Sequence, residues 1–369
     1  MQENLYLSTF RIKYSMMHAS SLCLAFAAIG TMALPTREDN SNVSLSDPNY
    51  GPIPGESRTY VDYNQTAAPF PGNITGAAMP TETGPPGPDD LLFQNLLSAE
   101  WAIFNFYQQG VEAFNQSSFT NLGLPNMTYD RVINIRDNEA GHLRIFQDSI
   151  SATSVKPGPC TYNYGFNNAS TWLALQVVLE LSSMAFLTGL VREAELKDTM
   201  SALVAIAEVE SRHNTWALID IFDINPFSGP ADTVFPYANE ILDLTNRYMV
   251  PGSCPAANPV YPSPRQKLPA TTAVVEKANG IVEFEFTDAG NQPDWYWQQK
   301  DRQYYAVYFH GVHNMTMPFD TKTNQSAHPT MFDTGEGMIV AVIANEVGAP
   351  SLDSVVAGPA LIIEQPSFS

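Results

Sequence analysis

The chain carries few charges, and few of these are basic. Only 15% of its 369 residues are charged, and 18 Lys and Arg stand against 38 Asp and Glu, which gives a formal net charge of −20. A surface this acidic repels nucleic acid phosphates and anionic lipid headgroups, so the composition excludes both as main partners. Global disorder is excluded as well, because 44% of the residues are apolar and 11% are aromatic, which is ample for a packed core.

Long hydrophobic runs are also missing, and no segment after the N-terminal region is expected to reach the length that spans a bilayer. That region has an apolar stretch over residues 22–34, with Arg11 and Lys13 upstream and the small Ala33 near its end. This order is typical of a secretory signal peptide. A membrane anchor is the alternative, but about 14 apolar residues are few for a span. We expect removal of residues 1–33 and a mature protein outside the cell or in its wall, away from the membrane.

Sequons for N-glycosylation agree with secretion, because this modification marks surface loops of secreted proteins. Eight Asn-x-Ser/Thr motifs occur, which is more than a few chance matches would give. Their asparagines are Asn42, Asn64, Asn73, Asn115, Asn126, Asn168, Asn314 and Asn324.

Cysteine is scarce, with three in the whole chain. Cys23 lies in the expected signal peptide, so Cys160 and Cys254 remain in the mature protein. An even pair in an oxidising compartment favours one disulfide, and two inert buried thiols are the alternative.

Proline marks the domain organisation. Ten of the 28 prolines fall within residues 34–88, where no helical periodicity is found, and this composition predicts an extended arm. A second Pro-rich stretch over residues 251–267 predicts a linker. Between them, residues 89–250 are expected to form a helical domain. After the linker, residues 268–369 contain short alternating or β-branched runs separated by Gly, Asn and Pro, which predict a small β-sandwich-like domain.

Four segments of the middle domain have apolar residues at helical spacing. The expected helices cover residues 90–114, 129–150, 170–193 and 197–222. The connection between the last two is short, so these helices must be antiparallel neighbours, and four such helices predict an up-down bundle. A shorter helix over residues 237–249 is expected to lean on its end.

Acidic and histidine side chains interrupt the apolar stripes at mid-helix. Glu100 and Glu180 each stand alone on the apolar face of the first and third helices. The second and fourth helices carry Glu-x-x-His motifs, in which residues three apart lie on one face. These motifs are Glu139 with His142 and Glu210 with His213. One Glu from each of two helices and a Glu-x-x-His from each of the others is the ligand set of ferritin-like di-iron and di-manganese carboxylate proteins.

Charge balance supports the same interpretation. Solvated or salt-bridged glutamates are the alternative, but Arg136 is the only base one helical turn from any of the four. Unpaired buried carboxylates are costly, by several kcal/mol each. Two Fe or Mn ions would balance four carboxylates, with the two histidines as neutral ligands. Tyr107 lies two turns from Glu100 and is near enough to hydrogen-bond a ligand or donate an electron, although a satisfied core tyrosine is favoured.

The stretches LLSAEWAIFNFY, NEAGH, LELSSMAF, EVESRH and NPFSGPADTVF, within residues 90–235, carry a family resemblance. They resemble the ferritin-like domain of secreted fungal stress-response and late-sexual-development proteins, and are similar to plant desiccation-related proteins. The resemblance covers the bundle well and the last third of the chain more loosely. It implies a ferritin-like fold and a metal site with all six ligand positions filled, but no settled reaction.

Two motifs of the last domain are candidate binding sites. His310 and His313 are a possible metal pair, but residues three apart on one strand face opposite sides, so surface or structural histidines are favoured. The aromatic run 295–297 could grip a sugar or a peptide, but ordinary packing is favoured.

Three functions fit the sequence. The first is an extracellular oxidoreductase, in which two Fe or Mn ions activate dioxygen or disproportionate peroxide during stress or development. The second is a stress-protective metal-binding protein without turnover. The third is a structural protein with cell-wall components as partners, in which the metal stabilises a scaffold.

Overall fold

The structure is a computed structural model, and it describes most of the chain after residue 76. The described residues are 77–230, 232, 237, 244–260, 268–276, 279–288, 290–293, 302–311, 313–329 and 337–363. Several predictions therefore lie outside the described residues. They are the signal peptide 1–33, most of the arm 34–88, the sequons Asn42, Asn64 and Asn73, the aromatic run 295–297 and residues 238–243 of the helix expected at 237–249.

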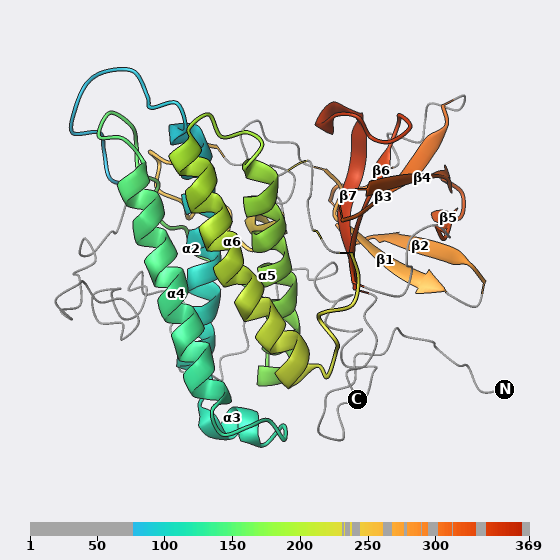
Figure 1. The fold of residues 1–369 in the computed structure, drawn as a ribbon, viewed down its shortest axis with the longest axis horizontal. Coiled ribbons are helices and arrows are strands. Elements are labelled where there is room, and N and C mark those ends of the chain that lie inside the picture. Colours follow the sequence, from blue (N-terminus) through green and yellow to red (C-terminus); the bar gives the residue numbers. More distant parts are fainter. Residues whose placement is uncertain are drawn as a thin grey trace.

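All four predicted long helices are present (Figure 1), three of them within about three residues of their expected bounds, whereas the fourth ends at Trp216 instead of 222. They are α2 (Asp90–Ala113), α4 (Thr128–Ser149), α5 (Ala169–Leu190) and α6 (Lys197–Trp216). A short helix that the sequence did not predict, α3 (Gln116–Thr120), joins α2 to α4, and α6 continues into the π-helical turn η2 (Ala217–Ile221). The helices pack mainly as two pairs, α2 with α4 and α5 with α6.

The up-down order expected of the bundle is wrong in one respect, because α4 and α5 run in the same direction. The first turns of α2 meet the last turns of α4, where Phe93 contacts Phe146 with ring centroids 6.3 Å apart. The end of α2 meets the start of α5, where Phe114 contacts Trp172 at 6.1 Å. Both α4 and α5 are thus antiparallel to α2. The connection over residues 150–168 is long enough to return along the bundle, and one long crossover of this kind is a feature of ferritin-like folds.

Side chains of α2 hold this crossover along its surface. The indole of Trp101 donates to the carbonyl of Pro157 at 3.0 Å, and the amide of Gln109 donates to the carbonyl of Tyr162 at 3.1 Å. Tyr164 donates in turn to the carbonyl of Ala102. These bonds satisfy backbone groups of the connection that would otherwise be buried without a partner.

The predicted disulfide between Cys160 and Cys254 is present. It joins the crossover to the segment that follows the bundle, next to the isolated bridge between Tyr162 and Met249. The backbone N–H of Val250 also donates to the carbonyl of Thr161 at 2.9 Å. The bond therefore closes a loop that contains both α5 and α6.

Removing this disulfide is expected to destabilise the protein strongly. The two cysteines are 94 positions apart, and a closed loop of that length contributes about 4–5 kcal/mol in the chain-entropy account. We expect the double variant Cys160→Ser, Cys254→Ser to lose about that much free energy of unfolding in urea. Peptide mapping without reduction checks the bond itself, and recovery of both cysteines as free thiols would contradict it.

The last third of the chain is β-rich, as predicted, and its described strands form one antiparallel sheet of seven. The strands are β1 (Thr271–Glu276), β2 (Ile281–Phe286), β3 (Tyr304–His310), β4 (His313–Asp320), β5 (Gln325–Ala327), β6 (Met338–Ala344) and β7 (Val355–Ile363). Their order is β1-β2-β5-β4-β3-β6-β7. The two outermost strands approach each other, and Gly358 before the end of β7 donates to the carbonyl of Pro269 before β1 at 3.1 Å. The sheet is therefore nearly barrel-shaped, with one curled sheet enclosing its core instead of two facing sheets.

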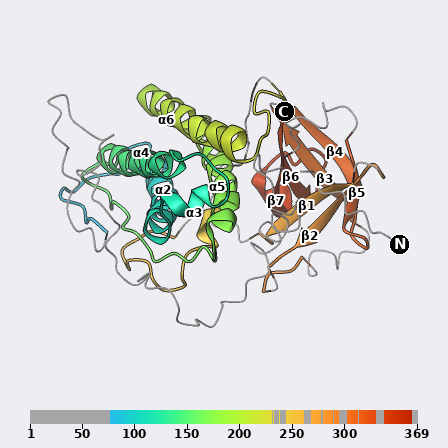
Figure 2. The same cartoon turned by 90° about the horizontal axis from the view of Figure 1, so that it is seen from below.

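Each face of this sheet has a separate core. Along β3, Tyr304, Ala306 and Tyr308 point into the enclosed core. The alternate residues Val307 and Phe309 belong to the same buried cluster as the helices. Figures 1 and 2 show the sheet beside the α5–α6 side of the bundle. The bundle and the sheet thus share apolar packing.

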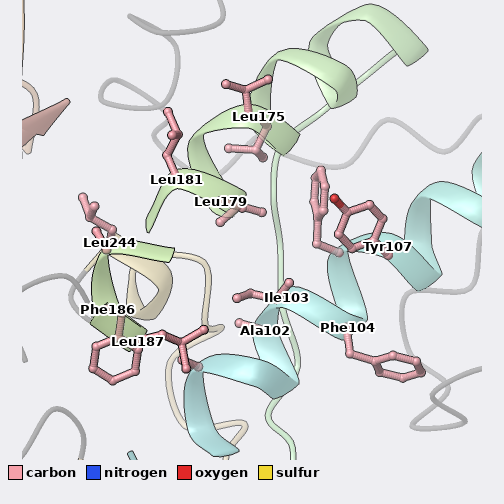
Figure 3. Close-up of a cluster of buried hydrophobic side chains, with 14 of the residues drawn as sticks. Ala102, Ile103, Phe104, Tyr107, Leu175, Leu179, Leu181, Phe186, Leu187 and Leu244 are labelled. Carbon is pink, nitrogen blue, oxygen red and sulfur yellow. The ribbon is translucent and has the colours of Figure 1, made fainter. Parts of the chain in front are cut away.

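Helix α5 is apolar on nearly all sides, because it packs in the bundle and also toward the sheet. Figure 3 shows Leu175, Leu179, Leu181, Phe186 and Leu187 of α5 among the buried apolar side chains. By length and composition α5 is the one described helix that could cross a membrane, so the prediction that no later segment reaches that length is wrong. Of its most apolar window, however, 89% is buried inside the protein, as in the core helix of a bundle.

The reason given against a histidine pair is also wrong, and the assignment of both residues as surface or structural histidines stays a prediction. His310 and His313 do not lie on one strand but flank the turn between β3 and β4, and they are direct register partners. Directly opposed residues of antiparallel strands share a face. His310 is buried and His313 exposed, and the metal-ligating clusters found among the described residues include neither.

Two of the predicted glycosylation sites cap helices. The side-chain oxygen of Asn115 accepts from the backbone N–H of Ser118 at 3.2 Å, and that of Asn168 accepts from Thr171 at 2.9 Å. Each forms a capping box, which explains why α3 and α5 begin there. N-glycosylation of these residues, and of Asn126, Asn314 and Asn324, stays a prediction.

Candidate metal centre

The four long helices bring all six predicted ligands together at the middle of the bundle. The lone glutamates lie near the centres of α2 and α5, and the two Glu-x-x-His motifs stack Glu and His on the inward face of α4 and α6, with His213 in the last turn of α6. None is more than 5% exposed. The six are Glu100 of α2, Glu139 and His142 of α4, Glu180 of α5, and Glu210 and His213 of α6.

Three carboxylates surround His142. Its Nδ1 atom lies 3.1 Å from an oxygen of Glu139, 3.2 Å from one of Glu210 and 3.4 Å from one of Glu100. Ligands that bind one ion at about 2.1 Å lie about 3.0–3.4 Å from each other, so these separations suit a shared ion. These four residues offer ligand atoms that all lie within 4.8 Å of one another.

His213 has the equivalent environment on the other side. Its Nδ1 atom lies 3.0 Å from Glu139, 3.4 Å from Glu180 and 3.6 Å from Glu210. Its Nε2 atom lies 3.2 Å from the side-chain oxygen of Asn138, and such a partner fixes the tautomer and orientation of a ligating histidine. Glu139, Glu180, Glu210 and His213 form the second group within 4.8 Å.

The two groups share Glu139 and Glu210. Glu139 directs Oε2 toward His142 and Oε1 toward His213, and Glu210 directs Oε1 toward His142 and Oε2 toward His213. Each of these two carboxylates therefore faces both histidines, one oxygen to each. Two cations bound here would share Glu139 and Glu210, and Glu100 and Glu180 would each serve one of them.

In the part of the chain that the structure describes, several buried polar atoms of the cluster are unpaired, and bound cations would satisfy them. Arg136, the only base near the carboxylates in sequence, is bound elsewhere, to Asp137 at 2.6 Å and to Gln108 at 3.0 Å. Buried atoms of the cluster have no hydrogen-bond partner among the described residues. They are Glu100 Oε1, Glu139 Oε1, Glu180 Oε2, both carboxylate oxygens of Glu210 and His213 Nδ1. Buried groups of this kind are normally satisfied, so six orphaned ligand atoms facing one centre fit bound metal ions.

Electrostatics divide the carboxyl groups into two kinds. Burial, with the neighbouring Glu139 charge, holds the pKa of Glu100 well above its usual value. Burial also raises the pKa of Glu180 well above normal, although His213 opposes it. Burial acts to raise the pKa of Glu139 and Glu210 too, but the two histidines beside them outweigh it and the pKa of each is lowered.

For the histidines, burial and the neighbouring charges also act on the pKa in opposite directions. Burial acts to lower the pKa of His142 and His213, but the surrounding carboxylates outweigh it and raise the pKa of both well above normal. Without metal, these directions favour a state in which Glu139 and Glu210 are ionised, both histidines are protonated, and Glu100 and Glu180 keep their protons. This state is neutral, as is the state with two divalent ions, four carboxylates and two neutral imidazoles.

Tyr107 contacts the cluster directly. Its hydroxyl donates a hydrogen bond to Glu180, and burial together with that carboxylate raises the pKa of Tyr107 well above its usual value. The sequence favoured a satisfied core tyrosine, and the residue is both: it is fully buried and it orients a ligand. Figure 3 shows its oxygen on the side of the ring that faces α5.

Two polar residues beside the cluster were not singled out from the sequence. Asn138 directly precedes Glu139, and Gln176 lies one turn before Glu180 on the otherwise apolar α5. Gln176 could have been found from the sequence, because it is a polar residue four positions from a predicted ligand and so lies on the same helix face.

Comparison with known proteins agrees with the geometry. A search of curated proteins finds no match to the chain. Residues 89–219, which include all four long helices and all six ligands but none of the sheet, match the family model of the ferritin-like domain. Residues 89–219 form a ferritin-like domain.

Proposed function

We propose that this protein binds two iron or manganese ions at mid-bundle and uses them for dioxygen or peroxide chemistry outside the cell, in stress or development. The observation that carries the proposal is the sharing of Glu139 and Glu210 between two ligand sets, each completed by its own histidine and its own terminal glutamate. Carboxylate and imidazole ligands suit Fe and Mn and disfavour soft ions such as Cu(I).

Two adjacent ions of variable oxidation state supply one-electron steps and Lewis acidity, which are the requirements of dioxygen and peroxide chemistry. The chain supplies the rest. Its helices hold the ligands within a core that is closed to bulk water, and Asn138 fixes the orientation of His213. Tyr107 holds Glu180 through its hydroxyl proton.

An extracellular location is supported by three features. The Cys160–Cys254 disulfide suits an oxidising compartment. Residues 1–33 have the order of a signal peptide, and eight sequons follow. The acidic surface and the resemblance to secreted stress-response proteins agree with this location, and cell-wall components are the partners we propose there.

Elemental analysis of the natively secreted protein, produced with both metals available, tests the proposal. Wild type is expected to carry about two Fe or Mn ions per chain. Because His142 and Glu180 each serve one ligand set, His142→Ala or Glu180→Ala should lower the content to one ion or none. Glu208→Ala, on the exposed face of α6, is the matched control and should keep both ions.

A peroxide-decay assay on the same samples tests the chemistry. Loss of activity in parallel with metal content supports the oxidoreductase. Two ions without turnover would favour the metal-binding protein without catalysis. Absence of Fe and Mn from wild type would overturn the dinuclear centre and leave a structural scaffold.

A further inference from the structure

Gln176 is a buried amide that the metal centre does not yet account for. It lies one turn before Glu180 on the same face of α5 and is 0% exposed. Neither its carbonyl oxygen nor its amide nitrogen has a hydrogen-bond partner among the residues that the structure describes. Buried side-chain amides are normally paired, so one with both ends orphaned calls for a ligand.

The surroundings of Gln176 direct it toward the metal centre. Its side chain lies near enough to the Tyr107 hydroxyl to act on the pKa of that group, and Tyr107 donates to Glu180. Gln176, Tyr107 and Glu180 therefore form one polar row. The row ends in the ligand set that contains His213.

The other ligand set, which contains Glu100 and His142, has no such polar residues beside Glu100 on α2. The residues one turn from Glu100 on α2 are all apolar: Leu96, Leu97, Ile103 and Phe104. The two halves of the centre are thus matched in their ligands but different in their neighbours. The half with Glu180 and His213 is the one that offers extra hydrogen-bonding groups.

A surface pocket lies at the far end of the same face of α5. Trp172, Gln176 and Glu180 follow one another at intervals of four residues. Trp172 contacts Tyr107 with ring centroids 5.7 Å apart, and on the other side it contacts Phe114 at 6.1 Å. Phe114 lines a pocket of about 460 Å³ that also includes Asn168. The buried Trp172 therefore lies between this pocket and Tyr107.

We propose that Gln176 binds a small oxygen anion, hydroxide or hydroperoxide, in the half of the centre formed by Glu180 and His213. The inference rests on the proposed function, since it requires an ion in that ligand set. The amide N–H donates to the anion, and the amide carbonyl accepts its O–H proton. The ligand-binding half of the centre is accordingly the Glu180–His213 half.

Azide, a small anion, is the probe for this site. The full chain is loaded with Fe(III), and azide binding is followed by its charge-transfer absorption. In Gln176→Leu we expect two irons per chain, as in wild type, and an azide affinity at least tenfold lower. Gln109→Leu is the control, because Gln109 is a buried amide of α2 whose partners, Asn105 and Tyr162, lie outside the centre. It should bind azide as wild type does.

The outcomes separate this inference from the function on which it rests. Wild-type azide affinity in an iron-loaded Gln176→Leu protein would overturn the role of Gln176 and leave the dinuclear centre standing. Absence of iron from wild type would overturn both.

A metal-free measurement keeps the test independent of loading. Because an unpaired buried amide is destabilising, Gln176→Leu should raise the unfolding temperature of the metal-free protein, whereas Gln109→Leu should lower it. A lower unfolding temperature in metal-free Gln176→Leu would mean that the amide is a structural hydrogen-bonding group, and would overturn the inference.

Discussion

Replacing Glu210 with glutamine is expected to remove both metal ions at once. The two oxygens of this carboxylate face different histidines, at 3.2 Å from His142 and 3.6 Å from His213. Glutamine keeps the shape of the side chain but carries no charge, and it offers only one oxygen. Each cation position would then lose a carboxylate ligand, so we expect the metal content to fall from about two ions per chain to nearly none by elemental analysis.

Two further variants make this result specific. Glu100→Gln removes a carboxylate that serves only the His142 side, and about one ion should remain. Glu208→Gln changes an exposed carboxylate two positions from Glu210 and should leave both ions in place. If Glu210→Gln and Glu100→Gln lose the same amount of metal, the bridging role of Glu210 is wrong.

Metal loading is expected to release protons. In the metal-free cluster the pKa of Glu100, Glu180, His142 and His213 is raised, which favours protonated forms of these four groups, and a metal ion must displace those protons. Binding therefore strengthens as the pH rises. Each proton released per ion corresponds to about a tenfold increase in metal affinity for each pH unit.

Calorimetry in buffers of different ionisation enthalpy measures the released protons directly. Release of no protons near pH 7 would mean neutral histidines and ionised carboxylates in the metal-free protein, and would contradict the pKa directions.

The stability of the metal-free protein should depend on pH in the opposite direction to metal binding. Groups with a raised folded pKa stabilise below their unfolded pKa and lose that contribution as the pH rises through the folded value. For His142 and His213 this loss begins above about pH 6.5. The free energy of unfolding of the metal-free protein should therefore fall above that pH, whereas that of the metal-loaded protein should rise.

The grouping of the six predicted ligands at mid-bundle was predictable from the sequence because its signal is local. A Glu and a His three residues apart must share a helix face, and a lone Glu on an apolar stripe must point inward, whatever the other helices do. The sharing of Glu139 and Glu210 was not predictable, because it depends on which oxygen of each carboxylate faces which helix. The same holds for Asn138, which meets His213 only through the packing of α4 against α6.

The relative direction of α4 and α5 and the closure of the sheet also could not be predicted from the sequence. Residues 150–168 carry little periodicity, and nothing local says whether such a connection turns back or returns along the bundle; its bonds to Trp101 and Gln109 decide this. The histidine pair fails for a related reason. A two-residue turn between β3 and β4 places His310 opposite His313, whereas an unbroken strand would separate them.

The apolar surface of α5 has a consequence for export. For a chain that is secreted as proposed, a 22-residue helix with a mean hydropathy of 1.7 over its most apolar window is a segment that a translocation channel can release sideways into the bilayer. Its single charged residue is Glu180, ten residues from its C-terminal end. An acidic residue at the centre of such a segment opposes insertion by about 2.5–3.5 kcal/mol. The carboxylate that completes one half of the metal centre thus also helps to keep this helix out of the membrane before any metal is bound.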